Sequence, residues 1–158
     1  MADRAKTRRH PGKPAPTRRP ATPAPAAMVV SPGDLWPFAA LGVLGAWTIV
    51  VPYLGRAIGI VVNVVSKVEI VDHVVPGSIV AAIGTYLAVA AYRGAPPKLS
   101  RPFAGGMCFL AGFWVLATHV SLVAQAVQGK EAWGSALWHA WTSVPIIGLS
   151  LWIVLKDG

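Results

Sequence analysis

Two histidines, His119 and His139, are the side chains of this sequence best suited to chemistry in an apolar environment. They lie on either side of a turn expected near Gly129 and Lys130, eleven residues before and nine residues after Lys130. At ~1.5 Å per helical residue, both imidazoles would lie roughly 14–16 Å from that turn and therefore in one layer. Facing imidazoles can bind a b-type haem, ligate a metal or transfer a proton.

A structural role for these histidines is the alternative. Each imidazole would then hydrogen-bond across helices, beside nearby hydroxyl groups. A divalent metal is disfavoured, because no carboxylate or third imidazole falls at the same depth. The residues therefore leave open a haem or quinone site at His119 and His139, a proton-transfer site, or helix packing alone.

Four long apolar runs must position these side chains. Hydrophobic residues make up 54% of the 158-residue chain and charged residues 13%, against about 25% charged in soluble domains. A span needs ~20 apolar residues, and the four runs cover residues 35–55, 74–92, 102–127 and 133–155. Lipid offers backbone groups no partner, so each span is predicted to be helical. The predicted fold is an all-α integral membrane protein, a four-transmembrane-helix bundle over residues 34–158.

The first 33 residues have a different composition. They are rich in proline and alanine, and half of the chain's 14 basic residues lie in the first 19 positions. Such a segment has too little apolar surface to fold, and we expect residues 1–33 to be a disordered basic tail. The tail is suited to anionic lipid headgroups. Nucleic-acid binding is not expected, because no aromatic residues accompany the charge.

The distribution of basic residues predicts the topology. The tail, the 93–101 connector and Lys156 together carry 11 Lys or Arg residues, whereas the connectors on the other side carry 3. Basic residues concentrate on the cytoplasmic side of membrane proteins. We therefore expect both termini to be cytoplasmic and the 56–73 connector to lie outside.

The 56–73 connector is unusually apolar for a solvated loop, yet it ends in the polar stretch "SKVEIVDHVVPG", residues 66–77. Burying these ionisable groups in lipid would cost several kcal/mol, so the stretch is predicted to remain hydrated outside the bilayer. Exposed apolar surface beside charges is typical of an interaction site. The predicted partner-docking residues are Arg56, Asn63, Lys67, Glu69, Asp72 and His73.

Small residues and one proline indicate how the spans pack. Ala104, Cys108 and Gly112 recur every four residues in the third span, a spacing that lets helices approach closely. Cys108, the one cysteine, is interpreted as a small buried side chain. Pro145 is expected to kink the fourth span or to free a carbonyl near Trp141.

Several function classes find no support in the sequence. It contains no phosphate-binding glycine loop followed by Lys and Ser or Thr, and no Ser/His/Asp or Cys/His set in one aqueous pocket. The four predicted spans carry no Asp, Glu, Lys or Arg, although proton-coupled pumps usually contain such a group. We therefore expect a protein that is not an enzyme.

An Ala/Val/Pro/Arg-rich tail ahead of a four-helix core is similar in composition to small membrane proteins of high-GC bacteria such as actinobacteria. This resemblance implies the bacterial plasma membrane. The first hypothesis is a non-catalytic accessory subunit of a larger envelope lipid-transport or respiratory complex, bound to other integral membrane subunits. The second is a redox or proton-handling subunit that uses His119 and His139. The third is a small homodimeric transporter.

Overall fold

The computed structural model describes residues 28–59, 67–130 and 133–156, with the side chains of Glu69, Ser135 and His139 excepted. This part of the chain is helical and contains no strand. A 3₁₀ turn, η1, precedes five helices, and the elements are η1 (Pro32–Asp34), α1 (Leu35–Ala57), α2 (Lys67–Arg93), α3 (Arg101–Val127), α4 (Trp133–Ala140) and α5 (Ser143–Leu155).

Four segments of this fold are long and apolar enough to cross a membrane: Pro32–Ala57, Ile70–Arg93, Arg101–Val127 and Ala136–Leu155. The prediction of an all-α protein with four candidate spans is therefore confirmed. Which side of the membrane each end faces stays a prediction.

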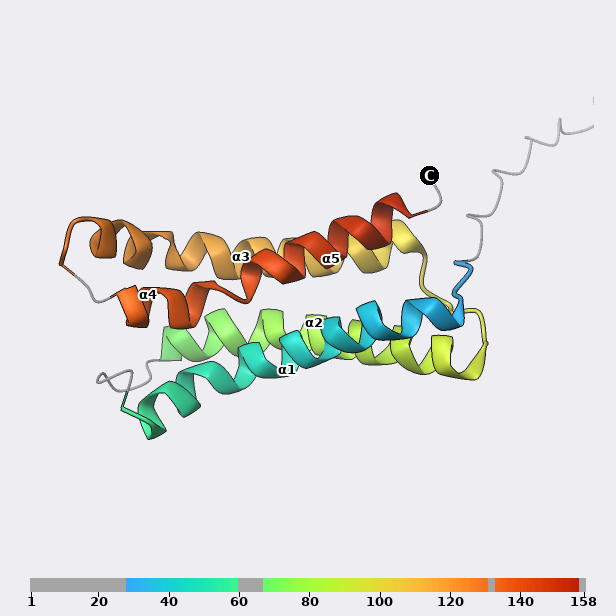
Figure 1. Cartoon of the computed structure of the whole chain (residues 1–158), viewed down its shortest axis with the longest axis horizontal. Coiled ribbons are helices and arrows are strands. Elements are labelled where there is room, and N and C mark those ends of the chain that lie inside the picture. The colour runs from blue at the N-terminus through green and yellow to red at the C-terminus, as the bar shows by residue number, and fades with distance from the viewer. Residues whose placement is uncertain (1–27, 60–66, 131–132, 157–158) are drawn as a thin grey trace, which may run out of the picture.

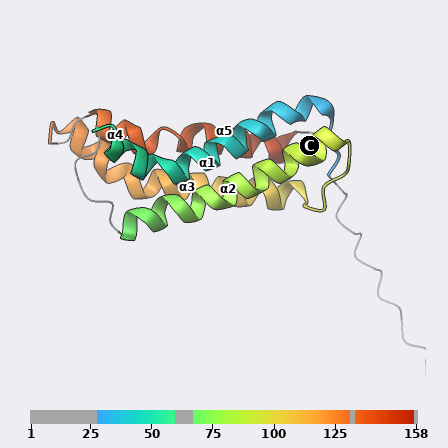
Figure 2. The ribbon, with the colours of Figure 1, turned by 90° about the horizontal axis from the view of Figure 1, so that it is seen from below.

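The helices form an elongated bundle in which α1 packs along α2 and α3 packs along α5 (Figures 1 and 2). One end of the bundle, called here the termini end, holds the start of α1, the α2–α3 connector and the end of α5. The other end, called the hairpin end, holds the end of α1, the start of α2, the turn after α3, and α4.

Glycines bring α1 and α2 into backbone contact. A Cβ atom on Gly45 would lie 2.2 Å from the backbone nitrogen of Ala81, and one on Gly84 would lie 2.3 Å from that of Gly42. No other residue type permits so close an approach, and small residues are what membrane helices use to pack tightly. Gly42 and Gly45 are three residues apart, so they do not match the four-residue spacing of small residues that predicts close helix packing.

The predicted row of small residues in α3 packs within the chain. Ala104 and Cys108 are fully buried, and a Cβ atom on Gly112 would lie 2.8 Å from a methyl carbon of Ile146 in α5. The row therefore serves the α3–α5 contact rather than an outer face. Cys108 is a buried free thiol, as expected.

The fourth predicted span, residues 133–155, is divided into two helices. α4 ends at Ala140 and α5 begins at Ser143, with Trp141 and Thr142 in a turn between them. Pro145 has no amide hydrogen and cannot donate to the carbonyl of Trp141, which explains a break at this point. The predicted disturbance by Pro145 is confirmed.

The start of the second span requires a correction. α2 begins at Lys67, seven residues before the predicted boundary at 74, so residues 67–77 of the polar stretch are helical. That they are hydrated outside the bilayer stays a prediction. The candidate span starts at Ile70 and therefore includes Asp72. The candidate span Pro32–Ala57 likewise includes Asp34. The expectation that no span carries an acidic side chain is therefore wrong for these two candidate spans. A helix directs neighbouring side chains to different faces. Lys67 is exposed, whereas His73 is buried.

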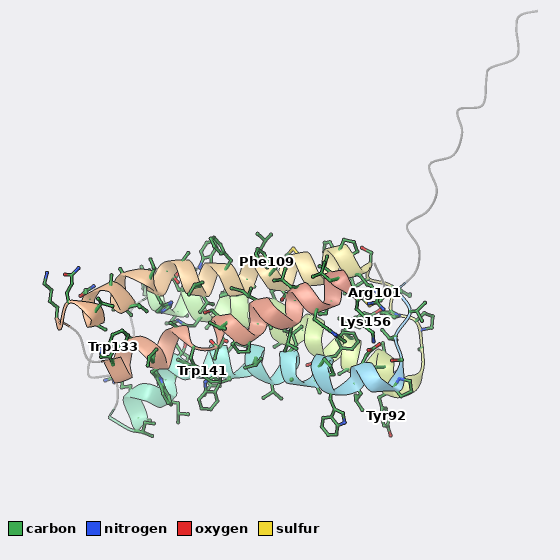
Figure 3. All side chains as sticks on the ribbon, turned by 45° about the horizontal axis from the view of Figure 1, so that its top comes forward. Tyr92, Arg101, Phe109, Trp133, Trp141 and Lys156 are labelled. Carbon is green, nitrogen blue, oxygen red and sulfur yellow. The ribbon has the colours of Figure 1, made fainter. Side chains whose placement is uncertain are left out.

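The termini end is closed by an ion-paired cluster. Lys156, just after α5, forms a salt bridge with Asp34, which is 2% exposed. Arg101, at the start of α3, donates to the Lys156 carbonyl at 2.9 Å and to the Val29 carbonyl at 2.6 Å. Figure 3 shows Arg101 and Lys156 together at this end. We call Asp34, Arg101 and Lys156 the termini clasp.

The ordered domain extends beyond the clasp toward the N-terminus. Met28 is 2% exposed and belongs to the hydrophobic core. The backbone amide of Ser31 donates to the Asp34 carboxylate at 2.8 Å. Residues 28–33, which were assigned to the tail, are therefore placed against the bundle, while the rest of the predicted tail lies outside the described residues.

Candidate functional site

Two imidazoles meet inside the hairpin half of the bundle. His73 on α2 is 0% exposed and His119 on α3 is 6% exposed. Their ring centroids are 4.7 Å apart, and the rings meet edge to face at 76°. His73 lies six residues after the start of α2 and His119 eight residues before the end of α3, so both are roughly 9–12 Å from the hairpin end of their helices.

The hydrogen bonds of His119 define its neutral form. Its Nδ1 lies 2.8 Å from the carbonyl oxygen of Val115, one helical turn earlier. A carbonyl oxygen only accepts, so Nδ1 carries the hydrogen and donates it. The lone pair of the neutral ring is then on Nε2. A proton that binds to His119 must bind at Nε2.

Thr118 reinforces this assignment. Its hydroxyl lies 3.0 Å from the Trp114 carbonyl, 3.2 Å from the Val115 carbonyl and 3.0 Å from Nδ1 of His119. Because the hydroxyl hydrogen has two carbonyl acceptors within reach, the hydroxyl oxygen remains available to accept from Nδ1. The His119 ring is thus held in position by its own helix.

A carboxylate lies directly before the pair in sequence. Asp72 is partly buried, and its Oδ1 accepts a hydrogen bond from Nε1 of Trp114 at 3.1 Å. Trp114 is 51% exposed on the face that α3 presents outward. The Asp72–Trp114 and His73–His119 contacts therefore join the same two helices.

Three buried hydroxyl groups form a second polar layer around the break between α4 and α5. Thr48, Thr142 and Ser143 are each at most 1% exposed. The Thr48 hydroxyl lies 2.8 Å from the Leu44 carbonyl and 3.4 Å from the Thr142 hydroxyl, and the Ser143 hydroxyl donates to the Ala140 carbonyl. These groups bring α1, α4 and α5 to one polar level, called here the hydroxyl layer.

The predicted His119–His139 pair is not tested by this structure. His139 belongs to α4, but its side chain lies outside the described residues. The residue that the structure places against His119 is His73. A planar haem does not fit between two rings in direct contact, so this second pair does not clamp one. Among the described residues, no three His, Cys, Asp or Glu side chains gather closely enough to hold a metal ion.

The predicted docking residues do not share one surface. Arg56 and Lys67 are exposed, Asp72 bonds to Trp114, and His73 is buried in the bundle. His73 has no exposed surface in this structure, and a docking role for the set stays a prediction. The other two members of the set, the Asn63 residue and the Glu69 side chain, lie outside the described parts of the chain.

Comparison with known proteins adds no identification. No protein-family model matches the sequence, and no curated protein or solved structure matches it either. The buried imidazole pair and its polar surroundings are therefore the basis for a functional proposal.

The His73–His119 contact had a detectable signal in the sequence. His119 and His139 were paired because both lie at a similar distance along their helices from the same end of the bundle. The same comparison applies to His73 if its helix begins at Lys67 rather than at residue 74. The six helical residues between Lys67 and His73 bring the ring to about 9 Å depth. The charged residues at 67, 69 and 72 concealed this because they favoured a solvated connector.

Proposed function

We propose that this protein is a proton-handling subunit of a membrane complex, and that it binds and releases one proton at His73 and His119. The observation that carries the proposal is the contact between two buried imidazoles inside a bundle of membrane-spanning length. Ionisable side chains at such positions are costly in a membrane and usually functional. Histidine is the side chain whose charge changes near neutral pH.

The pair is suited to a single proton. Two like charges at a ring separation of 4.7 Å repel each other, so the first proton opposes the second. Such groups titrate as a unit rather than independently.

Nitrogen-15 NMR of histidine-labelled protein in lipid nanodiscs tests this proposal. We expect His119 at high pH to show the tautomer with hydrogen on Nδ1, because Nδ1 donates to the Val115 carbonyl. On acidification, one proton should be shared between the two rings, and replacement of either ring should alter the titration of the other.

Two independent, complete titrations of His73 and His119 would refute the proposal. An absorption spectrum of the same sample addresses the haem alternative at His119 and His139. A Soret band that disappears in His119→Ala would establish a haem protein in place of a proton-handling one.

A role as a non-catalytic accessory subunit is the second candidate, and one surface feature favours it. An outward-facing hollow of about 430 Å³ lies between α1 and α2, and its floor includes Ala39, Gly42, Ala46, Thr85 and Ala88. Small residues of this kind allow another membrane helix to approach closely. The proposed partners are other integral membrane subunits of a respiratory or lipid-transport complex, and a homodimer, as in a small transporter, would use the same hollow.

Purification at native expression levels tests this second candidate. A tagged protein extracted in mild detergent should retain integral membrane partners, and Ala46→Trp, which fills the hollow, should release them. Gly106→Trp is a suitable control because no atom lies within 4 Å of a Cβ at that glycine. A protein that purifies alone would rule out the accessory role.

The proposed location is the bacterial plasma membrane with both termini cytoplasmic, supported by the 11-to-3 distribution of basic residues. Cysteine labelling from outside intact cells checks it, in a Cys108→Ala background. Arg56→Cys at the hairpin end should react and Lys98→Cys at the termini end should not. Both replaced residues are exposed and basic, so the pair is matched. The reverse labelling pattern would invert the topology.

A further inference from the structure

We infer that the His73–His119 pair exchanges its proton with one side of the membrane only, the side of the hairpin end. The pair then reports the pH of that compartment and does not conduct protons across the bilayer. This inference rests on the proposed proton site and adds the side from which the site is reached. It follows from a difference in what the two halves of the bundle bury.

The hairpin half has a polar interior that continues inward from the imidazoles. A Cβ on Gly112 would meet Ile146, so these two residues of the antiparallel helices α3 and α5 lie at the same depth in the bundle. Ser143, three residues earlier in α5, is thus about level with Val115, one turn from His119. The hydroxyl layer therefore lies roughly one helical turn deeper than the imidazole pair.

Three prolines leave main-chain carbonyls without their helical donors in this same half. Pro52, Pro76 and Pro145 have no amide hydrogen, which removes the usual donor to the carbonyls of Thr48, Asp72 and Trp141. The three prolines lie in α1, α2 and α5, respectively. Each carbonyl sits at or beside a residue of the polar interior.

A buried donor is also left over in this half. Nε1 of Trp47, adjacent to Thr48, is buried and has no hydrogen-bond partner among the described residues. Buried groups of this kind usually bond to internal water. Three carbonyls that lack their helical donors and one buried donor without a partner among the described residues indicate that the hairpin half is the half that water enters.

The termini half has an apolar interior. Leu41, Leu87, Ile146 and Ile153 are at most 1% exposed and belong to the hydrophobic core cluster. We call these four residues the apolar plug. The next buried polar group in α5 after Ser143 is Ser150, seven residues or about 10 Å further on, and its hydroxyl already donates to the Ile146 carbonyl at 2.6 Å.

The charged and titratable groups around the pair agree with access from the hairpin end. Asp72, adjacent to His73 on α2, is partly exposed, and the side chain of Glu69, one turn before His73, lies outside the described residues. Arg56, Lys67 and Lys130 are exposed at the hairpin ends of α1, α2 and α3. The described side chains of α1, α3 and α5 present no charge at the depth of the pair, and the side chain of His139 on α4 lies outside them. Within the plug region, Cys108 offers only a weakly bonding thiol.

A flux assay with a pH-sensitive dye trapped in liposomes tests this inference. Wild-type protein, challenged with a pH difference and potassium with valinomycin to balance charge, should give the same proton flux as empty liposomes. Ile146→Ser places a hydroxyl in the plug between Ser143 and Ser150 and should raise the flux at least tenfold. Adding His119→Gln to that variant should return the flux to the baseline.

Leu151→Ser is the matched control, because Leu151 lies in the same helix but is 44% exposed on the outer surface. It should leave the flux at the baseline. Leu41→Ser repeats the test from α1 in case Ile146→Ser does not fold.

Wild-type flux above that of empty liposomes, if abolished by His119→Gln, would overturn one-sided access while leaving the proton site intact. Folded plug variants without flux would overturn the role of the plug. If NMR detects no titration of either ring, the proton site itself fails. The two proposals therefore fail in different measurements.

Discussion

The two halves of this bundle differ in the largest side chains that they bury: the imidazoles lie in the hairpin half, and the buried leucines and isoleucines lie in the termini half. In the hairpin half, the interior contains His73, His119 and the hydroxyl layer. There α1 and α2 contain interior prolines, and α4 and α5 are separated by a break. In the termini half, the helices are continuous and bury aliphatic side chains, and the buried carboxylate among the described residues there, Asp34, is paired with Lys156. The chain thus separates a polar interior from an apolar one along a single axis.

This difference indicates a division of labour. Apolar side chains packed at close range, with glycines between α1 and α2, provide most of the stability of a membrane bundle. Polar groups in the interior contribute less stability and impose desolvation costs. Tight apolar packing in the termini half can therefore stabilise the bundle, while the polar groups of the hairpin half carry out its function. The comparison predicts that changes in the two halves will have separable effects.

The largest loss of stability is expected from the glycine contact that supports both halves. In Gly45→Ala, the new Cβ would lie 2.2 Å from the Ala81 backbone nitrogen, so α1 and α2 must move apart. We expect the free energy of unfolding to fall by about 3 kcal/mol, as measured by denaturation in mixed micelles. Gly106→Ala, which meets open space, should be neutral. Equal effects at the two glycines would contradict the tight α1–α2 packing.

A smaller loss is expected in the termini clasp. Asp34→Ala leaves Lys156 without its partner at a partly buried site. Breaking a buried pair costs ~3–5 kcal/mol, but Lys156 retains 28% exposure, so we expect about 2 kcal/mol. Proton uptake by the histidines should not change. A shift in the His119 titration in this variant would show that the halves are coupled rather than separate.

Replacement of an imidazole should change the stability little and proton binding strongly, the reverse of the expectation for the termini clasp. His119→Gln loses the ring contact with His73 and alters the bond to the Val115 carbonyl, for which we expect about 1 kcal/mol of destabilisation. Its effect on proton binding should be far larger, because one of the two acceptors is gone. Combined unfolding and NMR measurements on one sample check both. A loss of stability like that of Gly45→Ala would assign His119 a packing role instead.

The smallest effect is expected in the hydroxyl layer. Thr142→Val keeps the shape of the side chain but removes a hydroxyl whose partner, Thr48, is 3.4 Å away. Hydrogen bonds between membrane helices average ~0.6 kcal/mol, and we expect a change of about that size. Val144→Thr, on the exposed side of α5, is the control. A change above about 2 kcal/mol would show that this layer is a stability element after all.

Much of the architecture was predictable from the sequence because membrane spans depend on the length and composition of apolar runs. The third helix, Arg101–Val127, begins within one residue of the predicted span and ends with it. The break in the fourth span was predictable because Pro145 has a local and unconditional effect on hydrogen bonding.

The functional pair was harder to predict because it depends on a boundary that composition conceals. Charges at 67, 69 and 72 favour a loop when residues are counted together, but a helix separates them by face, with Lys67 exposed and His73 buried. Which imidazole meets His119 is decided by the packing of α2 on α3, which no local pattern encodes. The clasp between Asp34 and Lys156 likewise joins residues 122 positions apart.

The most direct test of the central claim counts protons in a His10→Gln/His139→Gln background, where His73 and His119 are the only imidazoles. Proton uptake between about pH 8 and pH 5, the range in which histidine titrates, is compared with that of variants that lack one or both rings. A pair that shares one proton predicts the same uptake with both rings present as with either ring alone, and one proton less with neither. One additional proton taken up when both rings are present would contradict the account.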